Sequence, residues 1–345
     1  MTRLGKRNSH LTNLPGSYAA MKAYSEMAEG VFPPYLMLQN PSNYSSDVVS
    51  TDDYGIRFSS FKGSFIGINE ANNFDFVNLV IGASTAFGVG SSSDDKTLSS
   101  LLSELNNEPW LNLGIRGCNS FQEIILLTHL IGSLPPIKNI VILSGINDLY
   151  RNVMDSEISY YDKRFGYQND YLSMYSPRKI AKSYFISLLS NKTVREVLES
   201  DWKPGSKNDH EYDTHRVLKN LSNICNRNFK IYSKFKFAQR VSYVLQPFAS
   251  ISKEQFTHNE AQAFLRTERL QRNTNWQTHK RRLISLHKQY KVLLVNAANA
   301  NSVTLYDANK WFGDDIDLFV DHVHLTDLGY YKIAENLHEK ILKIA

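Results

Sequence analysis

Four short segments of the chain carry residues that could together form a serine active site. Ser84 follows an apolar run in a turn of small residues, where its hydroxyl would be exposed and nearby N–H groups could face an oxyanion. Gly117 could offer a further unhindered N–H, and Asn147 could donate its side-chain amide to the same oxyanion. Asp321 and His324 stand three residues apart and could supply a general base and the carboxylate that fixes its tautomer. This set predicts acyl chemistry through a serine nucleophile.

Each of these residues also has a simpler interpretation. Ser84 could be the N-cap of a helix that follows a strand, and Gly117 could only make a turn between a strand and a helix. Asn147 could form an Asx-turn. His322 competes with His324 as the base, but it directly follows the aspartate, and one turn could not aim both groups inward. We therefore favour His324, and the case rests on the combination of all four segments.

The elements that must position these residues alternate regularly along the first half of the chain. Apolar runs bounded by Gly and Pro predict buried strands, and apolar residues at helical spacing predict helices between them. One helix should start with Asn119 or Ser120 as N-cap and Gln122 or Glu123 at the capping-box position. The expected order is strand 74–82, helix 97–107, strand 110–114, helix 119–134 and strand 137–145. Such alternation predicts a parallel sheet, whose strands end at one edge beside the candidate residues.

The pattern changes after residue 150 and resumes near residue 240. The intervening stretch is polar and rich in Tyr, with helices expected at 178–190 and 217–229 and a loop at 199–213. A C-terminal helix should run through 330–344 with Thr326 as its N-cap. Between them we predict strand 240–248, a helical stretch at 258–289 and a last strand at 291–297.

The four segments resemble the SGNH hydrolase (GDSL-like lipase/esterase) family, which is named after a Ser, a Gly, an Asn and a His in separate blocks. Here Ser84 lies in GASTAFG, Gly117 in NLGIRG, Asn147 in GIND, and His324 in DHVH. The resemblance implies an α/β fold, a flavodoxin-like three-layer α/β/α sandwich with a parallel sheet of about five strands. It also implies an oxyanion hole made by the N–H groups of Ser84 and Gly117 and the Asn147 side chain. Asp321 and His324 would complete the triad.

One departure from the family pattern concerns the residue before the nucleophile. The usual Gly-Asp-Ser is Gly-Ala-Ser here, with Ala83 in place of the acid. That aspartate is not the triad acid, so its loss is compatible with activity. For domain organisation we expect a lead-in at 1–73 that packs on the core, and an SGNH domain at 74–345 with an insertion at 151–239. The lead-in and the insertion should form the lid and the leaving-group side.

Composition limits the class of protein. Hydrophobic residues make up 42% and charged residues 21% of the 345, as in globular proteins, and the net charge of +5 is too mild to indicate nucleic acid. Cys118 and Cys225 have no metal-site or disulfide-framework spacing. We expect a cytoplasmic protein without signal peptide, membrane span, cofactor or metal. Its partner should be a small-molecule or glycan ester, and the oligomeric state is left open.

Competing sites have weaker sequence support. Gly88 and Gly90 begin a G-x-G that Ser93 does not complete, so a nucleotide fold is disfavoured. A metal site would need one more ligand than the set Asp317, Asp321, His322 and His324 provides.

The function expected from the sequence is a serine esterase or deacetylase. It would hydrolyse an acyl ester of a carbohydrate or small molecule, with acetyl as the expected acyl group, through a Ser-His-Asp triad and an acyl-enzyme. An O-acyltransferase that uses the same triad is the first alternative, because a closed, dry site favours transfer. A catalytically degenerate SGNH scaffold used for binding is the second, and Ala83 is what motivates it.

Overall fold

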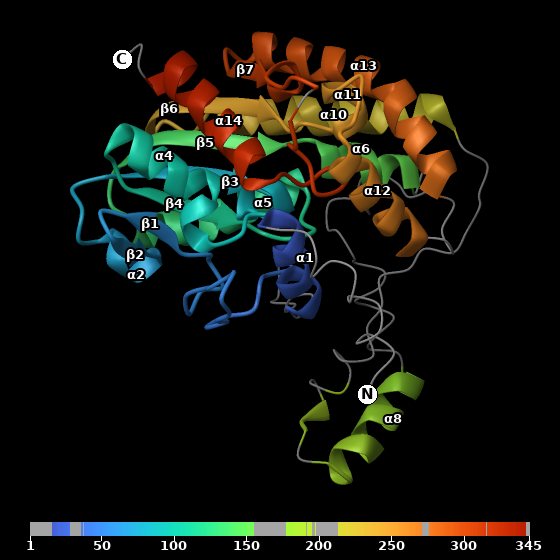
Figure 1. Ribbon diagram of the computed structural model, residues 1–345. Coiled ribbons are helices and arrows are strands. Elements are labelled where there is room, and N and C mark those ends of the chain that lie inside the picture. Colours follow the sequence, from blue (N-terminus) through green and yellow to red (C-terminus); the bar gives the residue numbers. More distant parts are fainter. Residues whose placement is uncertain are drawn as a thin grey trace.

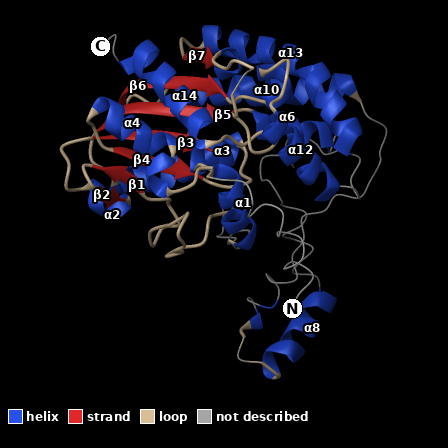
Figure 2. Ribbon diagram, in the orientation of Figure 1, coloured by secondary structure: helices blue, strands red, loops and turns tan. Residues whose placement is uncertain are grey.

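A five-stranded parallel sheet forms the centre of the molecule (Figures 1 and 2). The computed structural model describes residues 16–27, 36, 38–154, 177–190, 192–194, 197, 213–270, 276–314 and 316–342. The strands are β3 (Val77–Gly82), β4 (Trp110–Gly114), β5 (Ile137–Ser144), β6 (Ala238–Leu245) and β7 (Thr304–Asp307), in the spatial order β4-β3-β5-β6-β7. Numbered along the chain within this sheet the order is 2-1-3-4-5, the flavodoxin-like arrangement, so the predicted fold class is confirmed.

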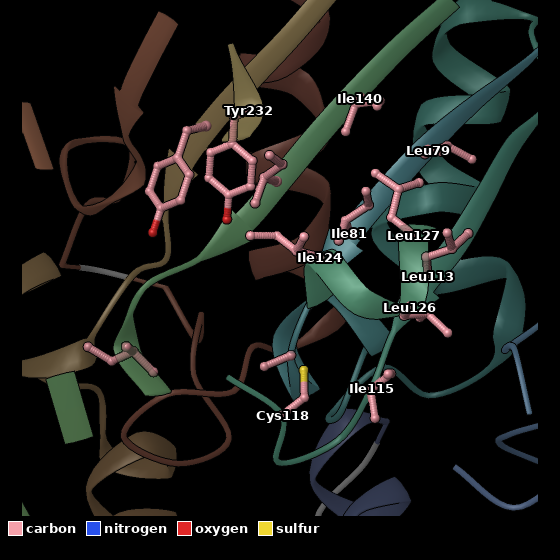
Figure 3. Packing of buried hydrophobic residues seen from close by; sticks show 14 of the residues in the cluster. Leu79, Ile81, Leu113, Ile115, Cys118, Ile124, Leu126, Leu127, Ile140 and Tyr232 are labelled. Carbon is pink, nitrogen blue, oxygen red and sulfur yellow. The ribbon is translucent and has the colours of Figure 1, made fainter. Parts of the chain in front are cut away.

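Helices cover both faces of the sheet, because the strands are apolar on both sides. In β3, Val80 belongs to one hydrophobic cluster, whereas Leu79 and Ile81 belong to the other. Figure 3 shows the cluster that contains Leu79 and Ile81, which lie near Leu127. The Val80 face is covered by α4 (Leu98–Asn106) and α14 (Asp327–Leu337), and the opposite face by α5 (Ser120–Leu130), α10 (Thr214–Tyr232) and α13 (Trp276–Ala300).

Shorter elements complete the described part of the chain. The helices are α1 (Ser17–Glu26), α2 (Ile68–Ala71), α3 (Ser84–Phe87), α6 (Ile146–Met154), α8 (Pro177–Leu188), α11 (Ala249–Ser252) and α12 (His258–Leu270). A hairpin is formed by β1 (Ser59–Phe61) and β2 (Ser64–Ile66), and tighter or wider helical turns occupy Asp94–Lys96, Ile131–Ser133, Ala308–Lys310 and His338–Leu342. Helix α8 lies apart from the sheet (Figure 1).

Most of the expected elements are confirmed, with their caps. Asn119 is the N-cap of α5 and forms a capping box with Gln122, and the Thr326 side chain accepts a hydrogen bond from the Gly329 N–H at the start of α14. The predicted helices at 178–190 and 217–229 correspond to α8 and α10. The loop expected at 199–213 lies outside the described residues except for Asp213, which caps α10.

The prediction of a last strand at 291–297 is wrong. That run is the C-terminal part of α13, and the fifth strand is β7 at the edge of the sheet. Its buried side chains, Leu294 and Ala297, continue the helical spacing of Leu283, Leu286 and Tyr290 further upstream. A short apolar run fits a strand and a buried helix equally well, and here the longer helical period decided.

The described part of the lead-in is anchored to the core by Arg57, a fully buried side chain. Its Nε donates to Asp94 Oδ1 at 2.7 Å, and its Nη1 donates to the Gly88 carbonyl at 3.0 Å and to the Tyr24 hydroxyl at 2.8 Å. The Tyr24 hydroxyl in turn donates to the Gly88 carbonyl at 2.7 Å. A buried guanidinium needs this many partners, and they hold the lead-in against the end of α3, the helix that begins with Ser84.

Candidate active site

Ser84 lies at the carboxyl end of β3, where the strand order reverses. Gly82, the last residue of that strand, has φ +155°, and a Cβ atom there would come within 2.1 Å of the Leu143 carbonyl oxygen. Ala83 follows as the N-cap of α3, and Ser84 is the first residue of that helix. The N-cap interpretation of Ser84 is therefore wrong, and the chain turns sharply to place the serine at the edge where open α/β sheets bind ligands.

A continuous hydrogen-bonded chain links Ser84, His324 and Asp321. The distance between His324 Nε2 and Ser84 Oγ is 2.7 Å, and that between His324 Nδ1 and Asp321 Oδ2 is 2.6 Å. With the aspartate ionised, Nδ1 carries the proton and donates it, which leaves Nε2 free to accept from the serine hydroxyl. The structure thus brings together three residues that are up to 240 positions apart.

Asp321 is held as an anion. Its other oxygen, Oδ1, accepts hydrogen bonds from the N–H groups of Val323 and His324, both at 2.8 Å. Burial by itself would raise the pKa of Asp321, but the electrostatic interaction and hydrogen bond with His324 and these two N–H groups lower that pKa to about 2. The carboxylate can therefore orient the imidazole throughout the neutral range.

A second set of contacts fixes the loop that carries His324 against α3. The Thr85 hydroxyl donates to the Val323 carbonyl at 3.2 Å, and the Gln246 side-chain amide donates to the Thr85 hydroxyl at 2.6 Å. These three buried or half-buried residues come from α3, the end of β6 and the C-terminal loop. They hold the serine and the histidine at a fixed separation.

The two further oxyanion candidates lie beside Ser84. Gly117 has φ +78° in the turn after β4, and both Gly117 and Asn147 line the same cavity as Ser84. Asn147 does not form an Asx-turn. Its Nδ2 donates one hydrogen bond to the Cys118 carbonyl at 2.6 Å, which orients the amide and leaves its second N–H available for an oxyanion.

The cavity has a volume of about 190 Å³ and opens beside the serine. Its lining includes the polar candidate residues Ser84, Gly117, Asn147, Asp321 and His324. The remaining wall combines α6, α12, α13 and the segments after β6 and before α14, and it comprises Ile146, Tyr150, Phe248, Thr267, Trp276, Leu283, His322 and Val323. None of the described residues of 1–73 lines it, although the lead-in was expected to form part of the lid.

His322, the competing histidine, has a different environment. Its ring lies between Phe264 and Trp276, with centroid distances of 4.6 and 5.2 Å, and its Nε2 is 3.1 Å from Glu268 Oε1. Burial and the nearby charge of Lys280 lower the pKa of His322, so it is neutral at neutral pH. Of the two histidines, His324 is the one that contacts the serine.

The metal alternative receives no support from the geometry of the described residues. Thr257 and Asn259 donate hydrogen bonds to the Asp317 carboxylate, which therefore does not turn toward the histidines. Within the described ranges no group of three or more His, Cys, Asp or Glu side chains is placed to hold a metal ion.

The sequence did not indicate the apolar cavity wall or the residues that position the triad. Trp276 and Leu283 lie in a helix whose last part the sequence predicts as a strand, and Thr85 and Gln246 belong to no catalytic pattern. To predict that the wall residues lie together, one would have to know that α6, α12 and α13 meet at the same edge of the sheet.

Comparisons with known proteins give remote likenesses only. No family model and no curated protein matches the chain. Among solved structures, it is similar to a carbohydrate acetylesterase family member from Sinorhizobium meliloti, with 12% identity and a TM-score of 0.40 over 78% of this chain and 97% of that one. A lipolytic G-D-S-L family member from Veillonella parvula matches with 11% identity and a TM-score of 0.40, over 78% and 99% of the two chains. The aryl esterase of M. Smegmatis matches with 13% identity and a TM-score of 0.41, over the same shares.

These neighbours carry the esterase and G-D-S-L names that the sequence motifs also suggest. Because the TM-scores are below 0.5, these likenesses do not support an argument about function, and we infer the function from the site itself. The chain's own strand order defines its class, a flavodoxin-like α/β/α sandwich with a candidate serine site at the switch point. Among the described helices, none is both long enough and apolar enough to cross a bilayer.

Proposed function

We propose that the protein is a serine esterase of the SGNH type, with Ser84 as nucleophile, His324 as general base and Asp321 as the residue that orients it. The observation that carries this proposal is the unbroken chain of hydrogen bonds from Asp321 Oδ2 through His324 to Ser84 Oγ. A serine hydroxyl is a weak nucleophile by itself, and an imidazole acceptor at 2.7 Å is what activates it.

The reaction proceeds through an acyl-enzyme. Ser84 Oγ attacks the ester carbonyl carbon while His324 Nε2 takes its proton, and the carbonyl oxygen becomes an oxyanion. The N–H groups of Ser84 and Gly117 and the Asn147 amide stabilise that charge. His324 then donates the proton to the departing alcohol. Water, deprotonated by the same imidazole, attacks the acyl-enzyme, and the acid is released with Ser84 regenerated.

For the substrate we propose an acyl ester of a carbohydrate or small molecule, with acetyl as the starting expectation. Transfer to an alcohol is the second candidate function, and the largely apolar cavity wall favours it, because a dry site slows attack by water. Product analysis with an acyl donor and a competing alcohol separates the two. Free acid as the main product supports hydrolysis, and a new ester supports transfer.

Labelling with a fluorophosphonate tests the proposed nucleophile. Wild type and Ser84→Ala are incubated with the probe, and the adduct is located by peptide mass spectrometry. We expect an adduct on Ser84 in the wild type and none in the variant. A correctly folded wild-type protein that stays unlabelled would contradict the proposal and favour the binding scaffold, the interpretation that Ala83 motivates.

A further inference from the structure

We propose that the cavity beside Ser84 binds an apolar acyl group larger than acetyl, either a single ring or a chain of about six carbons. This inference rests on the proposed function, since it assigns the acyl side of the ester that Ser84 would attack. It replaces the acetyl expectation with a specific substrate class. The argument uses the chemistry of the cavity wall, its volume and the direction in which an ester must lie.

The cavity wall is apolar and largely buried before any ligand binds. Phe248 is fully buried, Leu283 and Ile146 are 2% and 3% exposed, and Trp276 is 8% exposed. Trp276 also packs against Tyr150, with a centroid distance of 6.4 Å. A wall already held in place by the core loses little conformational entropy when a ligand binds, so it favours an apolar ligand group of matching shape.

The volume exceeds what an acetyl group needs. An apolar cavity of about 150 Å³ in a protein can hold benzene, whereas this cavity measures about 190 Å³. The reacting carbonyl takes up the part of this volume beside Ser84, and an acetyl methyl group would leave most of the apolar wall uncovered. A ring or a six-carbon chain would cover that wall and gain the free energy of apolar burial.

A sugar ring suits this wall poorly. A carbohydrate needs several hydrogen-bond partners, but the Thr267 hydroxyl donates to the Ala263 carbonyl and is left only as an acceptor, and His322 Nε2 is bonded to Glu268. On this wall, the buried nitrogens without a hydrogen-bond partner among the described residues are Trp276 Nε1 and His322 Nδ1. They could serve one polar substituent, not the hydroxyls of a pyranose, so a sugar would have to lie outside the cavity as the alcohol.

The direction of the ester places the acyl group against this wall. The carbonyl oxygen must face Gly117 and Asn147, and the alcohol oxygen must come within reach of His324 Nε2, which returns its proton. Ile146 and Tyr150 lie on α6 on either side of Asn147, one residue before it and three after. The apolar wall therefore begins beside the oxyanion donors, where the acyl substituent leaves the carbonyl carbon.

Two ester series test the assignment in the wild-type protein, with acid release followed by titration at constant pH. The acyl series is ethyl acetate, ethyl hexanoate and ethyl phenylacetate, and the alcohol series is ethyl acetate, hexyl acetate and benzyl acetate. Each buried methylene increases kcat/KM roughly fourfold, so we expect ethyl hexanoate to exceed ethyl acetate by on the order of 10²-fold. The alcohol series should change by less than about tenfold.

The outcomes separate the specificity from the function. If ethyl acetate is hydrolysed as fast as ethyl hexanoate, or if only the alcohol series gains, the acyl assignment is overturned while labelled Ser84 still supports the esterase. If Ser84 takes no phosphonate and no ester is cleaved, the proposed function fails, and this inference fails with it.

A variant pair checks that the wall is responsible. Trp276→Ala should lower the ratio of kcat/KM for ethyl hexanoate to kcat/KM for ethyl acetate by about tenfold or more. Phe65→Ala, which removes a 57% exposed aromatic side chain on β2, is the matched control and should leave this ratio unchanged. Equal losses on both esters in a Trp276→Ala protein with wild-type melting would contradict a role in acyl binding.

Discussion

Two histidines that are two residues apart, His322 and His324, each bond a carboxylate, and only His324 also contacts a nucleophile. His324 bonds Asp321 on one side and Ser84 on the other. His322 bonds Glu268, which Lys280 also contacts at 3.2 Å, and its ring is enclosed by aromatic side chains. The local chemistry of the two pairs is similar. What differs is the third partner, and the tertiary structure alone decides it.

The backbone between the two histidines explains why they diverge. Asp321 accepts from the N–H groups of Val323 and His324, which tightens the segment into a turn. The Ala249 N–H donates a hydrogen bond to the His322 carbonyl at 2.9 Å, and the Val320 N–H donates one to the His324 carbonyl at 3.0 Å. The segment is thus held from both sides, and each imidazole has one fixed direction. A histidine two residues from the proposed general base can therefore be a structural residue that lines the cavity beside Ser84.

The largest expected effect is a difference in kcat between the same substitution made at each of the two histidines. His324→Gln should reduce kcat by about 10⁴-fold or more, as for other serine enzymes that lose the base. His322→Gln should leave kcat within about tenfold, because it contacts no reacting atom. Steady-state hydrolysis of a good ester substrate measures both. Comparable losses in two folded variants would show that the pairs are functionally equivalent and contradict the comparison.

The carboxylates give the next contrast. Asp321→Asn should lower kcat by about 10³- to 10⁴-fold, because an amide no longer fixes the Nδ1–H tautomer of His324. Glu268→Gln keeps the shape of the side chain and should cost less than about tenfold in kcat. The same assay applies, with circular dichroism to verify folding. A severe kcat defect in Glu268→Gln would mean that His322 takes part in the chemistry.

The pH dependence of stability separates the pairs without any substrate. The pKa of His322 is lowered, so the unfolded chain binds more protons than the folded one once the pH falls below about 6.5, and the free energy of unfolding decreases as pH falls through that range. His322→Phe should weaken this decrease between pH 7 and 5. Thermal melting over that range is the measurement, and an unchanged slope in the variant would contradict a buried neutral His322.

Asp321 should affect the stability in a lower pH range. Its lowered pKa, about 2, stabilises the fold above the ordinary value near 4, and that contribution is lost as pH falls from about 4 to 2. Asp321→Asn should therefore weaken the loss of stability between about pH 4 and 2, which thermal melting over that range measures; an unchanged acid limb would contradict an ionised Asp321.

The smallest expected effect is that of a chelator. Since a serine nucleophile needs no metal, EDTA should change the rate of ester hydrolysis by less than about twofold. A large loss of activity that added Zn²⁺ restores would favour a metal at His322 and His324, the alternative that the sequence left open.

Much of the fold was predictable because it follows from local patterns. The strands at 74–82, 110–114 and 137–145 have near-continuous apolar runs, and the caps Asn119 and Thr326 are short-range hydrogen-bonding signals. The strand order could only be inferred from the resemblance. The prediction of a strand at 291–297 is wrong because a run of seven residues, five of them apolar, does not reveal whether it continues a helix that starts at Trp276.

The sequence by itself determined the parallel α/β core and the candidates Ser84, Gly117, Asn147, Asp321 and His324, because the local residue types indicate where strands end and where glycine turns lie. The spacing to Asp321 favoured His324 over His322, but only the tertiary structure decided that His324 contacts Ser84 at 2.7 Å and that residues of α6, α12 and α13 line a largely apolar cavity. Both depend on contacts between segments far apart in the chain, over 200 residues in the case of the serine and its histidine. Such contacts arise from burial and packing of whole elements, which no local pattern encodes.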